Sequence, residues 1–140
     1  MDAFYADVLI YAIVPGHDFG RRVRRLFPAD AVDESGEVAG VGSVLLRPEV
    51  LTKPLRDGAS EEVDELVGLL RRLELRGVDE ATATLATALG ATYGLRTADA
   101  VHLATAVGAG ADRFITNNRR DFTKSIREID VTYPDELDAP

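Results

Sequence analysis

The sequence contains no cysteine, and this absence excludes a disulfide framework and any thiolate chemistry. A chain without cysteine fits a reducing compartment, so we expect a cytoplasmic protein. The N-terminal stretch MDAFYADVLIYAIVPG lacks the basic region of a signal peptide and carries acids at Asp2 and Asp7. No apolar run reaches the roughly 18 residues that a membrane-spanning helix needs, so we expect no membrane attachment.

Positive charge is in short supply, because 16 lysines and arginines face 24 aspartates and glutamates, for a net charge of −8. The overall electric field therefore opposes the binding of polyanions. Any role in nucleic-acid binding needs local basic groups or metal ions, whereas a basic partner segment suits the acidic balance. Arginine forks suit phosphate. Four arginines cluster in RRVRR (residues 21–25), which is either a phosphate-binding group or a solvated helix face. Arg119 and Arg120 favour contact with RNA.

The length of 140 residues and the hydrophobic content of 46% predict a single domain over residues 1–140 with one substantial core. Apolar runs alternate with helical patterns, which predicts βαβ units and a mainly parallel sheet. A polar connection is expected over residues 28–36. Strands are expected over residues 5–13, 37–43, 73–78, 112–116 and 126–134. Helices are expected over residues 21–27, 44–58, 80–94 and 98–110, and from Ser60 onward, with caps at Ser43, Ser60, Asp79 and Thr97 and ends at Gly58 and Gly94.

Four acids are candidates for one site at the carboxyl edge of the sheet, where ligands gather in open α/β folds. Carboxylates held together repel one another unless a cation lies between them. Hard cations such as Mg²⁺ and Mn²⁺ prefer oxygen ligands and can activate water for phosphoryl displacement. The candidate metal ligands are Asp7, Glu49, Asp99 and Asp121. Thr116 and Asn118, next to Asp121 in the chain, are expected to line the same site.

Three stretches carry a resemblance to a known family: ADVLIYAI near the start, SVLLRPEVLTKPLR in the middle, and LRTADAVHLATAVGAGADRFITNNRRDF near the end. Together they resemble the PIN-domain family, which includes the VapC-type toxins of toxin–antitoxin pairs. The resemblance covers nearly the whole chain. It implies a three-layer α/β/α sandwich and Mg²⁺- or Mn²⁺-dependent cleavage of RNA. It further implies an antitoxin protein as partner and a homodimer.

The family's site residues map unevenly onto this chain. Glu49, Asp99 and Thr116 match the middle Glu, the helix-start Asp and the strand-ending Thr. Asn118 lies where a fourth acid is usual, and nearby Asp121 is expected to compensate. Tyr5 takes the place of the first Asp. Asp7 lies two residues further on, on the same face of the expected strand, so we expect it to reach the metal.

Two other functions stay open. Tyr5 and Asn118 favour a degenerate PIN-like domain that binds RNA or protein without efficient cleavage. A phosphatase with Asp7 as nucleophile is a third reading, although no phosphate-cradling glycine loop accompanies Asp7. His102 shares a helical face with Asp99, and we expect it to be a packed histidine rather than a general base.

Overall fold

A computed structural model describes residues 1–27 and 37–139, so the polar connection expected over residues 28–36 lies outside the described residues. The described chain contains one five-stranded sheet in the order β3-β2-β1-β4-β5. Every neighbouring pair of strands is parallel, as the sequence predicted. The strands are β1 (Asp2–Phe4), β2 (Gly40–Ser43), β3 (Leu73–Arg76), β4 (Arg113–Ile115) and β5 (Asp130–Thr132).

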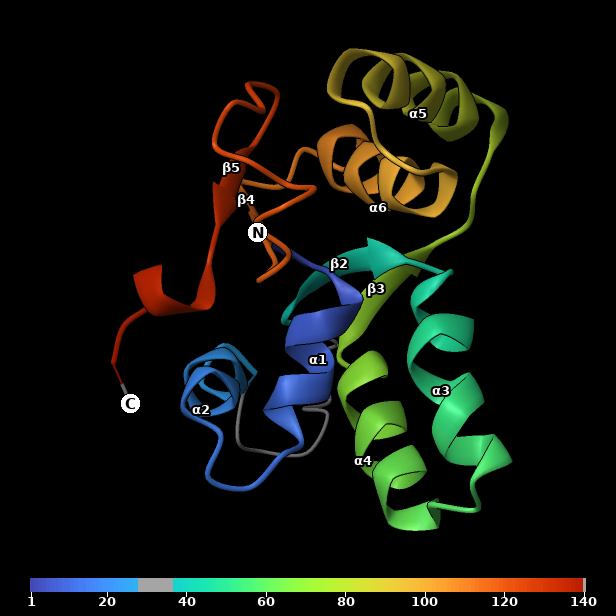
Figure 1. Cartoon of the computed structure of the whole chain (residues 1–140). Coiled ribbons are helices and arrows are strands. Elements are labelled where there is room, and N and C mark those ends of the chain that lie inside the picture. Colours follow the sequence, from blue (N-terminus) through green and yellow to red (C-terminus); the bar gives the residue numbers. More distant parts are fainter. Residues whose placement is uncertain (28–36, 140) are drawn as a thin grey trace.

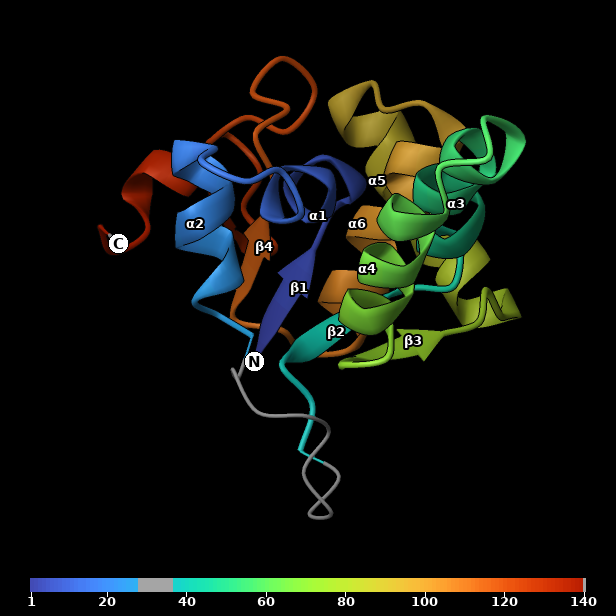
Figure 2. The same ribbon diagram turned by 90° about the horizontal axis from the view of Figure 1, so that it is seen from below.

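Helices cover both faces of this sheet, which confirms the predicted three-layer α/β/α sandwich. Figure 1 shows α5 and α6 on one side of the sheet and α1, α3 and α4 on the other. The view in Figure 2 agrees, and it places α2 beside α1. The helices are α1 (Ala6–Ala12), α2 (Asp18–Arg24), α3 (Leu46–Arg56), α4 (Ser60–Leu70), α5 (Glu80–Tyr93), α6 (Thr97–Gly108) and the short 3₁₀ helix η1 (Pro134–Glu136).

The sheet separates two apolar cores, because successive residues of a strand point to opposite faces. In β1, Ala3 packs with α5 and α6, whereas Phe4 packs with the helices of the opposite layer. In β4, Phe114 and Ile115 divide between the same two cores. The near-continuous apolar character of these strands follows from this double burial.

The order of the strands creates a switch point between β1 and β4. From β1 the chain moves outward through β2 to β3, and β4 and β5 then extend the sheet on the other side. In open α/β sheets the crevice at the carboxyl ends of two such strands is the usual ligand site. The backbone N–H of Tyr5 donates to the carbonyl oxygen of Ile115 at 3.0 Å, so the two carboxyl ends lie side by side.

The strand predicted over residues 5–13 was wrong. β1 ends at Phe4, and residues 6–12 form α1, with Tyr5 as its N-cap and Asp7 in its first turn. Val8, Leu9 and Ala12 are buried while Ile10 is 41% exposed, a helical pattern. Residues 5 and 7 therefore do not share a strand face. A first-turn acid before an apolar run was the available signal.

Several helix boundaries also differ from expectation. Asp79 caps α5 and Gly94 ends it at φ 67°, both as predicted. The helix predicted over residues 21–27 begins earlier, because His17 accepts a hydrogen bond from the backbone of Gly20.

Three predicted caps lie elsewhere. Ser60 and Thr97 are the first residues inside their helices rather than the caps, which are Ala59 and Arg96. The N-cap of α3 is Leu45 rather than Ser43, whose hydroxyl accepts from the Leu45 N–H.

Within the described residues, no helix is long and apolar enough to cross a membrane.

The close approach of α1 and α2 depends on Gly20. A Cβ atom at this position would lie 2.0 Å from the carbonyl oxygen of Tyr11. We expect Gly20→Ala to lower the free energy of unfolding by about 1–3 kcal/mol, the usual cost of overpacking, as measured by urea denaturation. Gly68→Ala in α4 is the matched control, because nothing lies within 4 Å of its Cβ position. The control should be neutral or stabilising, and equal stability of both variants would contradict this account.

Candidate functional site

The candidate site lies at the switch point, where the chain leaves β1 and β4. Tyr5 directly follows β1, and Thr116 directly follows β4. The first turns of three helices bring acids to this edge: Asp7 from α1, Glu49 from α3 and Asp99 from α6. The positive ends of the helix dipoles favour carboxylates at these positions.

Tyr5 is in direct contact with one of these acids. Its hydroxyl donates a hydrogen bond to the carboxylate of Asp99, which is only 7% exposed. The ring is fixed by three other rings: it meets Phe122 edge-on at 5.0 Å between centroids and lies 5.2 Å from His102 and 6.0 Å from Phe114. This packing leaves the Tyr5 hydroxyl pointed at Asp99.

The electrostatics of Tyr5 favour its neutral, donating form. Burial raises the pKa of the Tyr5 hydroxyl far above its ordinary value, and the hydrogen bond to Asp99 adds to the rise. The negative charges of Asp99, Glu49 and Asp7 raise it further. The phenol therefore stays protonated at physiological pH and remains a hydrogen-bond donor to Asp99.

Asp7 ties α1 to the loop that follows β4. Its carboxylate accepts from the backbone N–H of Asn117 at 2.9 Å and lies 3.5 Å from the hydroxyl of Thr116. It also accepts from the N–H of Val8 at 2.7 Å. Burial raises the pKa of Asp7 above its usual value despite these hydrogen bonds, which act in the opposite direction.

Glu49 lies beside a buried histidine. The Nε2 atom of His102 is 3.0 Å from Glu49 Oε1, and His102 is 2% exposed. The ring is not aligned for a hydrogen bond, and neither of its nitrogens has a partner among the residues that the structure describes. The two side chains are therefore in close polar contact without forming a hydrogen bond. His102 is packed, as expected.

The fourth acid has a local partner. Asn118 donates from its side-chain amide to Asp121 at 3.0 Å, and its Oδ1 accepts from the Asp121 N–H at 3.3 Å. The backbone carbonyl of Asn118 also accepts from the Phe122 N–H. The pair therefore forms a turn, in which the amide of Asn118 donates a hydrogen bond to the acid that was expected to replace its missing charge.

The two arginines beside this turn differ in their freedom. Arg119 forms an ion pair with Asp135 at 2.5 Å, donates to Asn117 Oδ1 at 3.2 Å and stacks 4.5 Å above the ring of Tyr133. Arg120 is exposed and forms no ion pair within the described part of the chain. Of the two predicted RNA contacts, only Arg120 is unoccupied.

A divalent metal such as Mg²⁺ or Mn²⁺ requires several oxygen ligands around one point. Within residues 1–27 and 37–139, no three histidine, aspartate or glutamate side chains are grouped so that they could hold a metal ion. Tyr5 holds Asp99, His102 adjoins Glu49, and Asn118 holds Asp121. The residues in this arrangement do not fit Mg²⁺ or Mn²⁺.

The structure adds two residues that the sequence did not single out. Asn117 joins three parts of the site, because its backbone donates to Asp7, its amide reaches the hydroxyl of Tyr11 at 3.4 Å and its Oδ1 accepts from Arg119. Tyr133 carries the cationic groups of Arg119 and Lys124 over its ring. The position of Asn117 directly after a strand-ending Thr was the only local signal. Nothing local marked Tyr133.

The raised pKa of Asp7 predicts a pH dependence of stability. An acid whose folded-state pKa is raised destabilises the fold as pH rises, because the unfolded chain gives up the proton more easily. The contribution of Asp7 to the free energy of unfolding should therefore fall from pH 3.8, the ordinary pKa of an aspartate, until the pH passes the folded-state pKa of Asp7. Asp7→Asn should remove this fall in urea denaturation between about pH 3.5 and pH 7. Asp64→Asn, an exposed acid of α4, is the control, and an unchanged slope in Asp7→Asn would refute the effect.

Comparisons with known proteins agree with this architecture. A model of the PIN domain matches residues 6–127. A chain from a toxin–antitoxin complex of Klebsiella pneumoniae is 22% identical, with a TM-score of 0.73 over 96% of this chain and 98% of that one. VapBC2 from Rickettsia felis, bound to a promoter DNA fragment, is 17% identical, with a TM-score of 0.68 over 94% and 97%. FitAB bound to the IR36 DNA fragment is 17% identical, with a TM-score of 0.65 over 99% and 98%.

No curated protein matched the chain. At these identities the structural likenesses show a shared fold. The family match covers most of the sequence and confirms the resemblance seen there, so this chain belongs to the PIN domain family.

Proposed function

We propose that this chain is the toxin-type member of a toxin–antitoxin pair, and that its PIN domain binds RNA without cutting it efficiently. The pairing is supported by three solved structures that share the fold: a toxin–antitoxin complex, VapBC2 and FitAB. The loss of efficient cleavage is supported by the internal partners of the four acids that a nuclease of this family would use.

One observation carries the proposal: the hydroxyl of Tyr5 donates to Asp99 where a cation would otherwise balance the acid. A phenol supplies one hydrogen bond and no charge, so it stabilises Asp99 without drawing in further acids. The ring also fills the space beside Phe122 and His102 with apolar surface. The site is thus stable without a metal, whereas bare carboxylates would repel one another.

RNA is the favoured ligand because exposed Arg120 lies next to this edge, in the loop after β4. A guanidinium binds a phosphate through two parallel hydrogen bonds. The net charge of −8 limits such contact to local groups. The same charge suits an antitoxin whose contacting segment is basic.

A second candidate is a Mg²⁺- or Mn²⁺-dependent endoribonuclease with Asp7, Glu49, Asp99 and Asp121 as ligands and with Thr116 and Asn118 lining its site. One observation favours it: Asp7, Glu49 and Asp99 lie in the first turns of three helices that begin at the same edge of the sheet. Rotation of Tyr5 would free Asp99 for a cation, at the cost of the ring contacts that hold it. Metal titration and an RNA cleavage assay separate the two candidates.

Restoring the two missing acids should restore metal binding. We expect the unmodified protein to bind Mn²⁺ weakly in calorimetry and to cut RNA slowly or not at all. Tyr5→Asp with Asn118→Asp should bind Mn²⁺ at least about tenfold more tightly, because ligand charge sets divalent affinity, and should gain RNA cleavage. Tyr5→Phe is the matched control, since it frees Asp99 without adding a charge. Fast cleavage by the unmodified protein would overturn the proposal in favour of the second candidate.

Two of the four acids, Asp99 and Asp121, can be ranked in the restored protein. Asp99→Asn should lower Mn²⁺ affinity and cleavage more than Asp121→Asn, because Asp99 is buried at the switch point while Asp121 lies in the outer turn with Asn118. Both variants are compared by circular dichroism first, so that a folding defect is not read as a lost ligand. Equal activity of Asp99→Asn and the restored parent would remove Asp99 from the site.

We also propose a homodimer, on the basis of the family resemblance. Light scattering at micromolar concentration should give twice the mass of the 15.1 kDa chain, and a monomer would contradict this part of the proposal.

A further inference from the structure

The C-terminal segment after β5, residues 133–139, is bound to the rest of the protein by more than its backbone. Leu137 is 6% exposed and packs in the same core as Val23 and Ile115. Glu136 caps η1 by accepting from the N–H of Tyr133 at 2.9 Å. The segment is therefore anchored by an apolar side chain and a local cap, and its charged groups are left for other contacts.

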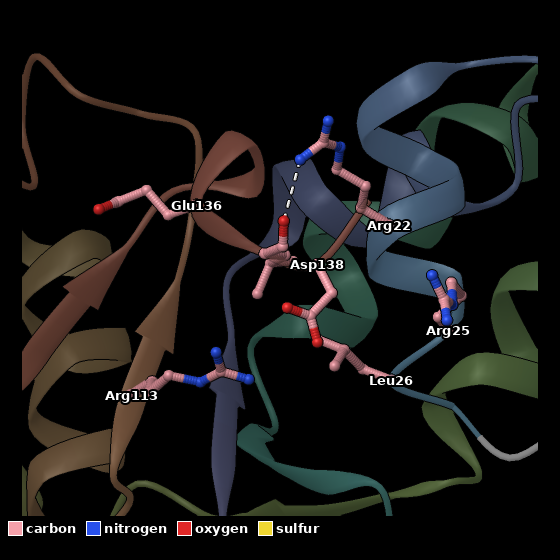
Figure 3. Close-up of a pocket in the computed structure, with 7 residues that line it drawn as sticks. Arg22, Arg25, Leu26, Arg113, Glu136 and Asp138 are labelled. Atoms are coloured by element: carbon pink, nitrogen blue, oxygen red, sulfur yellow. Dashed lines mark hydrogen bonds between the residues drawn. The ribbon is translucent and has the colours of Figure 1, made fainter. Parts of the chain in front are cut away.

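Two arginines of α2 bind this segment. Arg22 donates from Nη1 to the carbonyl oxygens of Leu137 at 2.9 Å and Asp135 at 3.3 Å, and Arg25 donates to the carbonyl of Ala139. They border a cavity of about 200 Å³ that Arg113 also lines. Figure 3 shows the three arginines spaced around the C-terminal segment. The RRVRR cluster is therefore not simply a solvated face.

Two acids of the segment form ion pairs, and a third, Asp138, lines the cavity with the arginines. Asp135 pairs with Arg119 at 2.5 Å, and Glu136 pairs with Lys124 at 2.6 Å. The pKa of Arg113 is raised by its hydrogen-bonded partner Asp2 and also by the negative charge of Asp138. The segment thus runs from Arg119, past the carboxyl end of β4, to Arg113, at the amino end of the same strand.

The arginines of the cavity keep unused hydrogen-bonding capacity. A guanidinium has five N–H donors, and the neutral carbonyls that Arg22 binds cancel none of its charge. Its Nε is buried and has no hydrogen-bond partner among the described residues. Arg113 donates hydrogen bonds from Nε and Nη2 to Asp2 at 2.9 and 3.0 Å, so its Nη1 is left to bind a ligand. A ligand with several anionic oxygens would use these donors better than the segment does.

We propose that Arg22, Arg25 and Arg113, with Arg119, form a phosphate-binding surface that the chain's own acidic C-terminal segment covers, so that Asp135 and Asp138 compete with the ligand. The ligand class is a phosphodiester backbone, which rests on the proposed binding of RNA. Such competition lowers the apparent affinity for the ligand according to the fraction of molecules in which the segment covers the arginines. Apart from Arg119, which contacts Asn117 at the border of the carboxylate site, the surface lies outside that site and does not depend on a metal.

The test removes the negative charges of the C-terminal segment and keeps the contacts that hold the segment in place. Asp135→Asn with Asp138→Asn leaves Leu137, the carbonyls bound by Arg22 and the Glu136 cap in place, so the segment still folds back. We expect this variant to bind tripolyphosphate, measured by calorimetry, about three- to tenfold more tightly than the unmodified protein, because exposed ion pairs of this kind are weak individually. A labelled single-stranded RNA, measured by fluorescence anisotropy, should show a similar gain.

Glu61→Gln with Glu62→Gln is the matched control, because it changes the net charge equally on α4, far from the segment in both overall views (Figures 1 and 2). At physiological salt this control should gain little, since exposed charges are screened within about 8 Å. Arg25→Gln in the neutralised variant should remove most of its gain. Equal tripolyphosphate affinity in the tail variant and the α4 control would overturn the inference.

The two probes separate this inference from the proposed function. A gain for tripolyphosphate without any RNA binding in either protein would support the surface and refute RNA as the ligand of the chain. A gain for RNA that Arg25→Gln does not reduce would leave RNA binding intact and overturn this surface as its location.

Discussion

The hydrogen bond from Tyr5 to Asp99 is the interaction on which the site depends. Asp99 is nearly buried at the start of α6, and a buried carboxylate needs a partner. A cation would meet that need and would also attract Asp7 and Glu49, which both act on the same hydroxyl. The phenol of Tyr5 meets it without charge, and its ring packs against Phe122. The other acids then find their own partners, Asp7 in the backbone of Asn117 and Glu49 beside His102.

The parallel sheet explains why these residues meet at all. Because β1 and β4 are neighbours and point the same way, the residues that follow them reach one edge although more than a hundred positions separate them in the chain. The same arrangement returns the C-terminal segment past α2, where Arg22 and Arg25 bind its backbone. The acidic balance of the chain is thus uneven: acids gather at the switch point, while arginines line the path of the segment. This division lets one domain hold a carboxylate site and a basic surface without either neutralising the other.

The sequence predicted the architecture better than it predicted the start of the chain. Strand–helix alternation indicated the parallel sheet, and Asp79 and Gly94 marked α5 at both ends because their roles depend on local backbone geometry. Residues 5–13 were misassigned to a strand, since an apolar run of that length suits a buried strand and a buried helix equally. The choice was made by β2 and β4, which pair with Asp2–Phe4 and leave the following residues to pack as α1. Asp7 in the first turn is a local signal for the helix, but the pairing of β1 with two distant strands lies in no local pattern.

By itself the sequence determined the family, the residue types available at the site and the two departures, Tyr5 and Asn118, because residue order and motif spacing are properties of the chain alone. Only the tertiary structure decided what those departures do. Whether Tyr5 leaves a gap or satisfies Asp99, and whether Asn118 or Asp121 supplies charge, depends on which side chains come within hydrogen-bonding distance. The same holds for Arg119, which lies beside the site in sequence but is held by Asp135 and Tyr133 in the fold. Hydrogen bonds and ion pairs act over a few ångströms, and contacts between residues distant in the chain exist only once the sheet has brought them together.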